Sequence, residues 1–168
     1  MADADGIITY IPQLRRYARA LTGDFTSAED LVQDTIERGW KRMALWRPGS
    51  DLRAWLFTIM HNLYVNQLKA GQRRKSQGAG HSDIDVPVAP PQENRLELID
   101  LHKALQRLPH EQREVLLLIG LEQLSYDEAA KVLSVPIGTV MSRLSRGREQ
   151  LRSMMNRGIA PAQLKVIR

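Results

Sequence analysis

Four polar side chains near the C-terminus have the types and the spacing to bind DNA. At about 100° per residue they share one face of a predicted helix, and they are Thr139, Ser142, Arg143 and Arg146. Arginine can donate paired hydrogen bonds to guanine or phosphate, and hydroxyl groups can bond to bases or backbone. The opposite face is apolar, with Ile137, Val140, Leu144 and Leu151. The pattern predicts an anchored recognition helix, and the alternative is an ordinary surface helix with solvated arginines.

A second predicted helix directly precedes this one. Ser125 and Glu128 have the spacing of a capping box, in which each side chain satisfies a backbone group at the helix start. Pro136 suits the first position of the following helix, where its missing N–H costs nothing. Two such helices in sequence predict a helix-turn-helix, whose second helix lies in the DNA major groove.

Another candidate DNA surface lies on the helix that Asp51 is expected to cap. One flank of this helix carries aromatic, amide and cationic side chains, namely Trp55, Asn62, Asn66, Lys69 and Arg73. Asparagine can bond to base edges, cations can bind phosphates, and an aromatic ring can stack on an unpaired base. The alternative is that the asparagines cap core groups and the tryptophan belongs to the core.

The overall composition narrows the class of protein. The chain has 168 residues, a net charge of +5 and no cysteine, which excludes disulfides and thiolate metal sites. No apolar run approaches the roughly 20 residues that a membrane span needs, and no signal peptide pattern opens the chain. We therefore expect a cytoplasmic protein without membrane insertion.

Charge is divided unevenly along the chain. Residues 141–168 carry seven arginines and lysines against one acid, whereas residues 1–40 carry seven acids against four arginines. The C-terminal part is therefore the predicted nucleic-acid end. The four histidines are scattered, and neither a glycine-rich phosphate loop nor a nucleophile with a base is present. We expect no enzymatic activity, no metal and no cofactor.

Helical periodicity runs through nearly the whole sequence, and no strand-type alternation persists. Ile8 and Trp40 fall on apolar stripes and are expected in the core, and Thr26 with Glu29 forms a second predicted capping box. Residues 71–92 are rich in glycine, serine and proline and predict a mobile linker. The expected fold is all-α, with two small helical domains at 1–72 and 95–168, the second a helix-turn-helix domain, joined by a flexible linker at 73–94.

Three long segments in order resemble one protein family. They are "AEDLVQDTIERGW" (28–40), "LRAWLFTIMHNLYVNQLKAGQRR" (52–74) and "LQRLPHEQREVLLLIGLEQLSYDEAAKVLSVPIGTVMSRLSRGREQLR" (105–152). Together they resemble the extracytoplasmic-function (ECF) sigma factors of the sigma-70 family, which direct bacterial RNA polymerase to promoters. The likeness covers nearly the whole chain.

The resemblance implies a role for each surface. The first segment would bind core RNA polymerase through an exposed face of Asp30, Gln33, Asp34 and Glu37. In the second, Asn62 aligns with the residue that contacts a flipped base of the −10 element, and residues 45–51 match the loop that shapes its pocket. In the third, Ser142, Arg143 and Arg146 align with contacts to the −35 element, and Thr139 lies near the DNA backbone.

Two positions depart from the family pattern. Many members have an acid where Asn66 stands, and Met141 occupies a place that is often arginine or lysine. Methionine cannot make a direct guanine contact, so we expect an altered −35 preference. Met141 either packs on the apolar side of its helix or touches a thymine methyl group.

The expected partners are core RNA polymerase, promoter DNA and a dedicated anti-sigma factor, as is usual in the family. Two other functions stay open. One is a helix-turn-helix regulator that binds its operator without polymerase. The other is a sigma-like decoy that sequesters an anti-sigma factor, although known decoys carry an attached phosphoreceiver domain and no such segment is found here.

Overall fold

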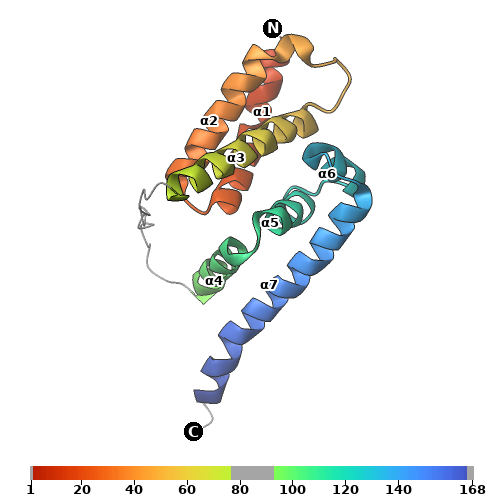
Figure 1. Cartoon of the computed structure of the whole chain (residues 1–168). Coiled ribbons are helices and arrows are strands. Elements are labelled where there is room, and N and C mark those ends of the chain that lie inside the picture. The colour runs from red at the N-terminus through yellow and green to blue at the C-terminus, as the bar shows by residue number, and fades with distance from the viewer. Residues whose placement is uncertain (1, 77–92, 166–168) are drawn as a thin grey trace. The chain divides into compact units, whose positions relative to one another are not determined.

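A computed structural model describes residues 2–76 and 93–165 of the chain. The described residues are helical apart from short turns, and no strand occurs among them (Figure 1). In chain order the helices are α1 (Ala2–Thr22), α2 (Phe25–Lys41), the 3-10 turn η1 (Met43–Leu45), α3 (Leu52–Ser76), α4 (Glu93–Arg107), α5 (His110–Leu116), the π-helical η2 (Leu117–Leu121), α6 (Tyr126–Leu133) and α7 (Ile137–Lys165).

The chain forms two compact units, the first containing α1 to α3 and the second most of residues 87–168. This confirms the expected all-α fold. Helix α3 continues through Ser76, so residues 73–76 of the predicted linker are helical. At its other end residues 93–94 belong to α4, and residues 77–92 of the predicted linker lie outside the described residues.

The turn between α1 and α2 differs from the predicted capping box. The side chain of Asp24 caps α2, accepting hydrogen bonds from the backbone N–H groups of Thr26 and Ser27 at 3.1 Å each. Gly23 ends α1 at a φ of 78°, which only glycine adopts without strain. Glu29 forms an ion pair with Arg15 instead of capping. The prediction failed because a better cap stands two residues earlier.

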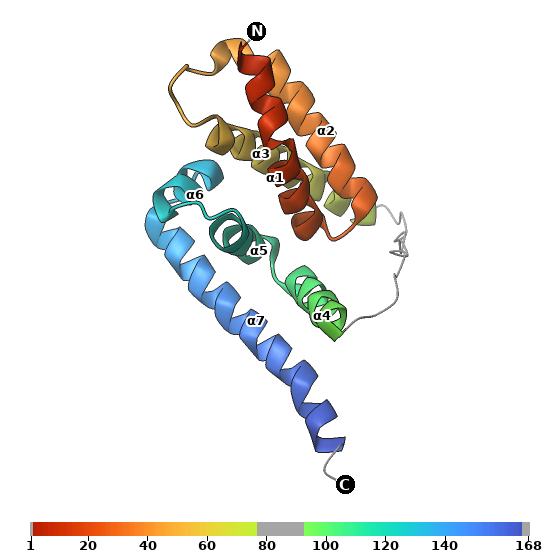
Figure 2. The ribbon, with the colours of Figure 1, turned by 180° about the vertical axis from the view of Figure 1, so that it is seen from behind.

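In the first unit α1 and α2 lie side by side and α3 crosses them (Figures 1 and 2). Tyr17 and Phe57 meet edge to face, with ring centroids 5.1 Å apart and planes at 78°. The fully buried side chains of this core include Ile7, Leu14, Leu21, Leu31, Leu56 and Met60. Two expected core residues are instead exposed, Ile8 by 53% and Trp40 by 49%.

Helix α3 begins as the sequence predicts, because Asp51 Oδ1 accepts a hydrogen bond from the Ala54 N–H at 3.2 Å. Its buried side chains point in more than one direction, with Leu56 and Met60 on one stripe and Phe57 and Tyr64 on another. A helix with two apolar ridges packs against two neighbours, which are α1 and α2. The remaining flank of α3 is left to solvent.

In the second unit α4 and α5 pack along α7. The core of this unit includes Leu108, Val115, Leu118, Ala129, Val140 and Leu144. The chain after α5 widens into a π-helical turn, where the Glu122 N–H donates to the Leu117 carbonyl at 3.0 Å. The helical periodicity of the sequence does not predict this turn.

A buried arginine on α5 forms hydrogen bonds to the end of α4. Arg113 Nε donates to the Leu105 carbonyl at 2.8 Å, and its Nη2 donates to the carbonyls of Gln106 and Leu108 at 3.0 and 2.8 Å. These carbonyls stand at the end of α4, where C=O groups lack the N–H groups of a following helical turn, and the Leu105 carbonyl also accepts from the Leu108 N–H at 3.2 Å. Arg113 therefore acts as a side-chain cap for α4.

We expect Arg113→Ala to loosen α4, because buried carbonyl groups left without a donor cost about 1–3 kcal/mol. Hydrogen exchange of the α4 amides should become about tenfold or more faster. Arg107→Ala is the matched control, since Arg107 is exposed at the end of the same helix. Unchanged exchange in α4 of the Arg113 variant would show that the cap contributes nothing.

Candidate nucleic-acid interface

Helix α7 carries the four side chains predicted to contact DNA near the C-terminus. Ser142 and Arg146 are exposed, and Thr139 and Arg143 are half-buried. The Ser142 hydroxyl donates to the Thr139 carbonyl at 3.2 Å. Within residues 2–76 and 93–165 neither arginine has a hydrogen bond or an ion pair. Both guanidinium groups can therefore bind a ligand without first breaking a contact to a described residue.

The opposite face of α7 is anchored in the unit. Val140 and Leu144 are buried, as predicted, whereas Ile137 is 41% exposed. Gly147 is buried against α5, and a Cβ built there would lie 3.0 Å from Leu116 Cδ1. A side chain at this position would therefore require the Leu116 side chain to shift by a few tenths of an ångström. Sequence patterning missed Gly147, because a glycine in a helix is not itself an apolar signal.

The turn before α7 fixes the direction in which its polar face points. The capping box of α6 is confirmed, since the Ser125 N–H donates to Glu128 Oε2 at 2.7 Å and the Glu128 N–H to Ser125 Oγ at 3.1 Å. Ser134 has a φ of 54°, and the Val135 N–H reaches back to the Ala130 carbonyl at 3.1 Å. This is the bonding of a Schellman motif, which ends α6 sharply.

The candidate surface on α3 is a continuous solvent-facing flank. Trp55 is half-buried, and four further side chains on the flank are exposed, namely Asn62, Asn66, Lys69 and Arg73. Among the described residues neither asparagine has a hydrogen-bond partner. The alternative in which they cap core groups therefore has no support. Their amides point outward and can offer paired donors and acceptors.

The face of α2 predicted to be acidic is also exposed, and it comprises Asp30, Gln33, Asp34 and Glu37. Glu37 Oε1 lies 2.7 Å from Lys41 Nζ one turn further on. The hydrogen bond and the charge of Lys41 lower the pKa of Glu37. Asp34 has no such partner in the described part of the chain, so its charge is not offset by an ion pair.

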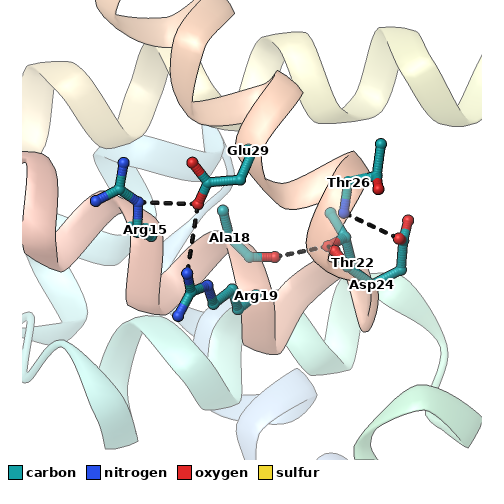
Figure 3. A network of polar contacts seen from close by, with 7 residues as sticks. All are labelled: Arg15, Ala18, Arg19, Thr22, Asp24, Thr26 and Glu29. Atoms are coloured by element: carbon teal, nitrogen blue, oxygen red, sulfur yellow. Dashed lines mark hydrogen bonds and ion pairs between the residues drawn. The ribbon is translucent and has the colours of Figure 1, made fainter. Parts of the chain in front are cut away.

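A small polar network holds α2 against α1 (Figure 3). Glu29 Oε1 lies 2.8 Å from Arg15 Nε and 3.5 Å from Arg19 Nη2. The Arg19 guanidinium also lies over the Phe25 ring, 5.0 Å from its centroid. Together with the Asp24 cap, these contacts fix the rotation of α2 about its axis and thereby the direction of its acidic face.

Beside the acidic face lies a groove of about 440 Å³ between α1 and α2. Its lining joins apolar and charged side chains, namely Arg15, Glu29, Val32, Gln33, Ile36, Glu37 and Trp40. The half-exposed Trp40 is the largest apolar group in it. The sequence placed this tryptophan in the core, so its accessibility emerges only from the structure.

Within the described segments, no group of three or more histidine, aspartate or glutamate side chains is arranged to hold a metal ion. No described helix is both long enough and apolar enough to cross a membrane. The features that stand out are therefore the polar faces of α2, α3 and α7.

Comparison with known proteins assigns the family. The model for sigma-70 region 4 matches residues 98–151, and the model for the sigma2 domain of PhyR matches residues 7–61. The ECF RNA polymerase sigma factor EcfG of Rhodopseudomonas palustris is 36% identical over 151 residues, which cover 90% of this chain and 83% of the relative. The chain belongs to the ECF RNA polymerase sigma factors.

Solved structures agree with this ECF sigma factor assignment. The sigma factor RpoE from Bartonella quintana, solved in complex with the anti-sigma factor NepR, matches with a TM-score of 0.81 and 37% identity, over 90% of this chain and 95% of that one. The anti-anti-sigma factor PhyR from the same organism, in complex with NepR, matches with a TM-score of 0.59 and 19% identity. It covers 86% of this chain and 47% of that one, and at this identity it shows the shared fold alone.

The matched ranges include some of this sigma factor's candidate residues and leave out others. The region 4 match contains all four α7 side chains, and the sigma2 match contains the acidic face of α2 and Trp55. The sigma2 match ends at residue 61, directly before Asn62. The roles of individual side chains therefore depend on their geometry and on experiment.

Proposed function

We propose that this sigma factor binds core RNA polymerase and directs it to promoters, with α7 contacting the −35 element and α3 the −10 element. The observation that carries the proposal is the polar face of α7. It presents Arg143 and Arg146, which have no partner among the described residues, on a helix whose other side is buried. Membership of the ECF sigma factors supports the same function.

On α7 the four side chains divide by their chemistry. Arg143 and Arg146 can each make a bidentate contact with guanine, and Ser142 can bond to any base edge. Thr139 stands at the helix start, where it can contact a phosphate. The second helix of a helix-turn-helix enters the major groove with its N-terminal residues toward the bases, which is the part of α7 that carries all four.

On α3 the proposed contact is with an unpaired base of the −10 element. Asn62 and Asn66 lie one turn apart on the exposed flank, and Trp55 supplies an aromatic surface on it. Lys69 and Arg73 extend the flank for phosphates of the same strand. Extruding a base costs a few kcal/mol, which the sigma factor can offset only while polymerase holds the promoter.

We expect Asn62→Ala to reduce opening of a promoter with a matched −10 element by about tenfold, because an amide pair contributes about 1–3 kcal/mol. Permanganate reactivity of the melted thymines measures this opening. Gln67→Ala is the control, since Gln67 is an exposed amide on another side of α3. If both substitutions reduce promoter opening equally, Asn62 does not contact the promoter.

On α2 the acidic face and the adjoining groove are the proposed site for core polymerase. Their carboxylates favour a partner surface with basic side chains, and Trp40 offers an apolar anchor of the kind that dominates interface energies. This function makes sense of the excess of acids in residues 1–40 of a basic protein.

The proposed domain organisation follows these surfaces. Residues 1–72 would form the sigma-2 domain, residues 95–168 the sigma-4 domain, and residues 73–94 the link between them. Core polymerase and promoter DNA are found in the bacterial cytoplasm, so we place the action of the protein there. The relative solved with NepR supports an anti-sigma factor as the third partner.

Run-off transcription tests the proposal directly. Core polymerase with the purified protein should give discrete transcripts from a subset of genomic fragments, and core polymerase alone should give none of them. A conventional helix-turn-helix regulator would instead shift its operator in a gel without polymerase. DNA binding without polymerase, together with no new transcripts, would overturn the sigma function.

A decoy for an anti-sigma factor is the second candidate, because the N-terminal unit matches the sigma2 domain of PhyR. A decoy has no need of promoter contacts, whereas the recognition face of α7 presents two arginines that pair with no residue in the described part of the chain. The same transcription assay separates the two functions. A protein that binds an anti-sigma factor but yields no transcripts with core polymerase would be a decoy.

A further inference from the structure

A groove of about 450 Å³ lies between the start of α6 and α7, and none of the predicted DNA-contacting side chains lines it. Tyr126 and Met141 give it apolar surface, beside the buried Leu144. Two exposed arginines, Arg148 and Arg152, line it further along α7. All five residues belong to the second compact unit, so the groove is a feature of that unit alone.

The position of Met141 assigns its side chain to this groove. The sequence allowed it either to pack on the apolar side of its helix or to touch a thymine methyl group. Met141 is 49% exposed, so it does not pack in the core. At about 100° per residue, it lies about 100–160° around α7 from Ser142, Arg143 and Arg146. Its exposed surface is therefore open to a ligand that does not occupy the proposed DNA-contacting face.

The two arginines share the direction of Met141. At about 100° per residue, Arg148 and Arg152 each fall within about 20° of Met141, so the three side chains form a row along α7. The exposed Glu149, which also lines the groove, falls about midway between this row and the DNA-contacting face. Its carboxylate would repel phosphates at the edge of the row. A duplex bound by the polar face of α7 therefore leaves the row accessible.

The residue types of the groove are those that protein interfaces favour. Tyrosine, methionine and arginine are enriched in protein–protein interfaces, whereas lysine and glutamate are depleted there. Neither Arg148 nor Arg152 has an ion pair or a hydrogen bond to any described residue. Each guanidinium can therefore bind a carboxylate through two parallel hydrogen bonds. This chemistry fits a protein partner that offers both apolar and acidic side chains.

The spacing of the row specifies the partner further. At about 1.5 Å per residue, Arg148 and Arg152 stand about 10 and 16 Å beyond Met141 along α7. A partner helix lying alongside would match these levels with an apolar residue and with acids seven and eleven residues away from it, the same intervals as in the row. Residues at these intervals fall within about 40° of one another on a helix, so one stripe can carry all three. Recognition of an amphipathic helix in a groove uses anchors spaced along one stripe in this way.

We propose that this groove docks a protein partner through an acidic amphipathic helix, whose apolar side chain packs on Met141 and Tyr126 while two carboxylates bind Arg148 and Arg152. The inference goes beyond promoter recognition and rests on it only for the side of α7 that DNA occupies. Because a bound duplex leaves the row accessible, the partner can bind while the sigma factor is on its promoter.

A synthetic helical peptide tests the chemistry of the groove. It carries a leucine with glutamates seven and eleven residues away, and it is made in both chain orders because a partner helix can run either way. Fluorescence anisotropy with the full chain should show that one order binds at least about tenfold tighter than the same peptide with glutamines, since charge-assisted hydrogen bonds are about twice as strong as neutral ones. A peptide of the same charge, with its glutamates moved off the stripe, should bind as weakly as the glutamine peptide. Equal binding of the three peptides would overturn the proposal.

Substitutions in the protein test the location of the site. Arg148→Ala and Arg152→Ala should each weaken binding of the acidic peptide by about fivefold or more, and so should Met141→Ala. Arg157→Ala is the matched control, since Arg157 is exposed on the same helix outside the groove. Binding that survives the loss of both groove arginines, or that Arg157→Ala weakens as much, would show only general attraction to a basic protein and would contradict the site.

Promoter binding separates this inference from the proposed function. Holoenzyme with Arg148→Ala or Arg152→Ala should bind a matched promoter with wild-type affinity and salt slope, whereas Arg146→Ala should lose promoter use but bind the peptide as wild type does. A salt slope lowered by about one unit in either groove variant would assign that arginine to a phosphate and overturn the proposal. Failure to direct core polymerase is measured by run-off transcription alone, so the two proposals fail independently.

Discussion

Replacing Arg146 with alanine is expected to reduce promoter use by about ten- to a hundredfold, chiefly on templates with the matched −35 element. Arg146 is exposed in the polar face of α7, beside Ser142, and Leu144 anchors the opposite side of the helix. A bidentate arginine–guanine contact contributes about 1–3 kcal/mol of discrimination. The guanidinium has no partner to lose among the described residues, so the whole effect should appear in DNA binding.

Arg146→Lys sharpens this test, because lysine keeps the charge but lacks the planar fork that forms two parallel bonds. If Arg146 contacts guanine, lysine should lose nearly as much as alanine on matched templates. If Arg146 binds a phosphate, lysine should retain most of the affinity, and alanine should lose equally on matched and scrambled templates. Run-off transcription and binding by the holoenzyme on both templates measure the difference.

Arg157→Ala supplies the control for loss of a positive charge on the same helix. Substitutions at exposed positions usually change stability by less than about 0.5 kcal/mol, so both variants should unfold as wild type does. If the Arg146 variants lose neither promoter use nor DNA binding, this side chain does not contact DNA.

Sequence patterns predicted the local structure correctly where a short motif forms hydrogen bonds between its own residues. The Ser125 and Glu128 box and the Asp51 cap appear as predicted, as do two of the four predicted anchors of α7, Val140 and Leu144. These features depend on neighbours three or four residues apart, which a helical wheel relates correctly. The same holds for the exposed flank of α3, whose members share one side of a single helix.

Features set by contacts between helices were not predicted. Trp40 was expected in the core, but Gly39 occupies the close approach, where an added Cβ would lie 3.2 Å from Leu56 Cδ2 and 3.5 Å from Ile7 Cδ1. The missing side chain lets α1 and α3 approach α2 at Gly39, so Trp40 faces the groove. Gly147 against α5 is the same case in the second unit.

The buried charge of Arg113 was missed for a similar reason. Its three acceptors belong to residues between five and eight positions earlier, across a turn between helices. An arginine in an amphipathic pattern normally indicates a solvated face. The turn between α4 and α5 brings the carbonyl groups at the end of α4 close to the Arg113 side chain on α5.

Charge reversal on α2 is expected to reduce affinity for core polymerase by about a hundredfold at low salt, because like charges brought together in an interface cost several kcal/mol. The variant is Asp34→Lys with Glu37→Lys, which changes the charge of the face by four units. Both side chains are exposed, so the packing of α2 on α1 and α3 is untouched. Association of labelled protein with core polymerase, followed over a range of salt, measures the loss.

The two substitutions should not contribute equally. Glu37 already pairs with Lys41, and a partner must compete for its carboxylate, whereas Asp34 has no ion pair in the described part of the chain. Asp34→Lys alone should therefore account for most of the effect. Glu37→Lys places two lysines one turn apart, which costs the helix only about 0.2–0.5 kcal/mol, so circular dichroism should be unchanged.

Asp5→Lys is the matched control, because Asp5 is an exposed acid on α1 that lines neither the acidic face nor its groove. If long-range charge alone governs association, Asp5→Lys and Asp34→Lys should slow it equally, and both effects should vanish at high salt. A loss that is larger for Asp34→Lys and persists at high salt indicates direct contact, since a desolvated pair is screened far less than an exposed one. If the double variant folds and binds core polymerase with wild-type affinity, this face of α2 is not the polymerase site.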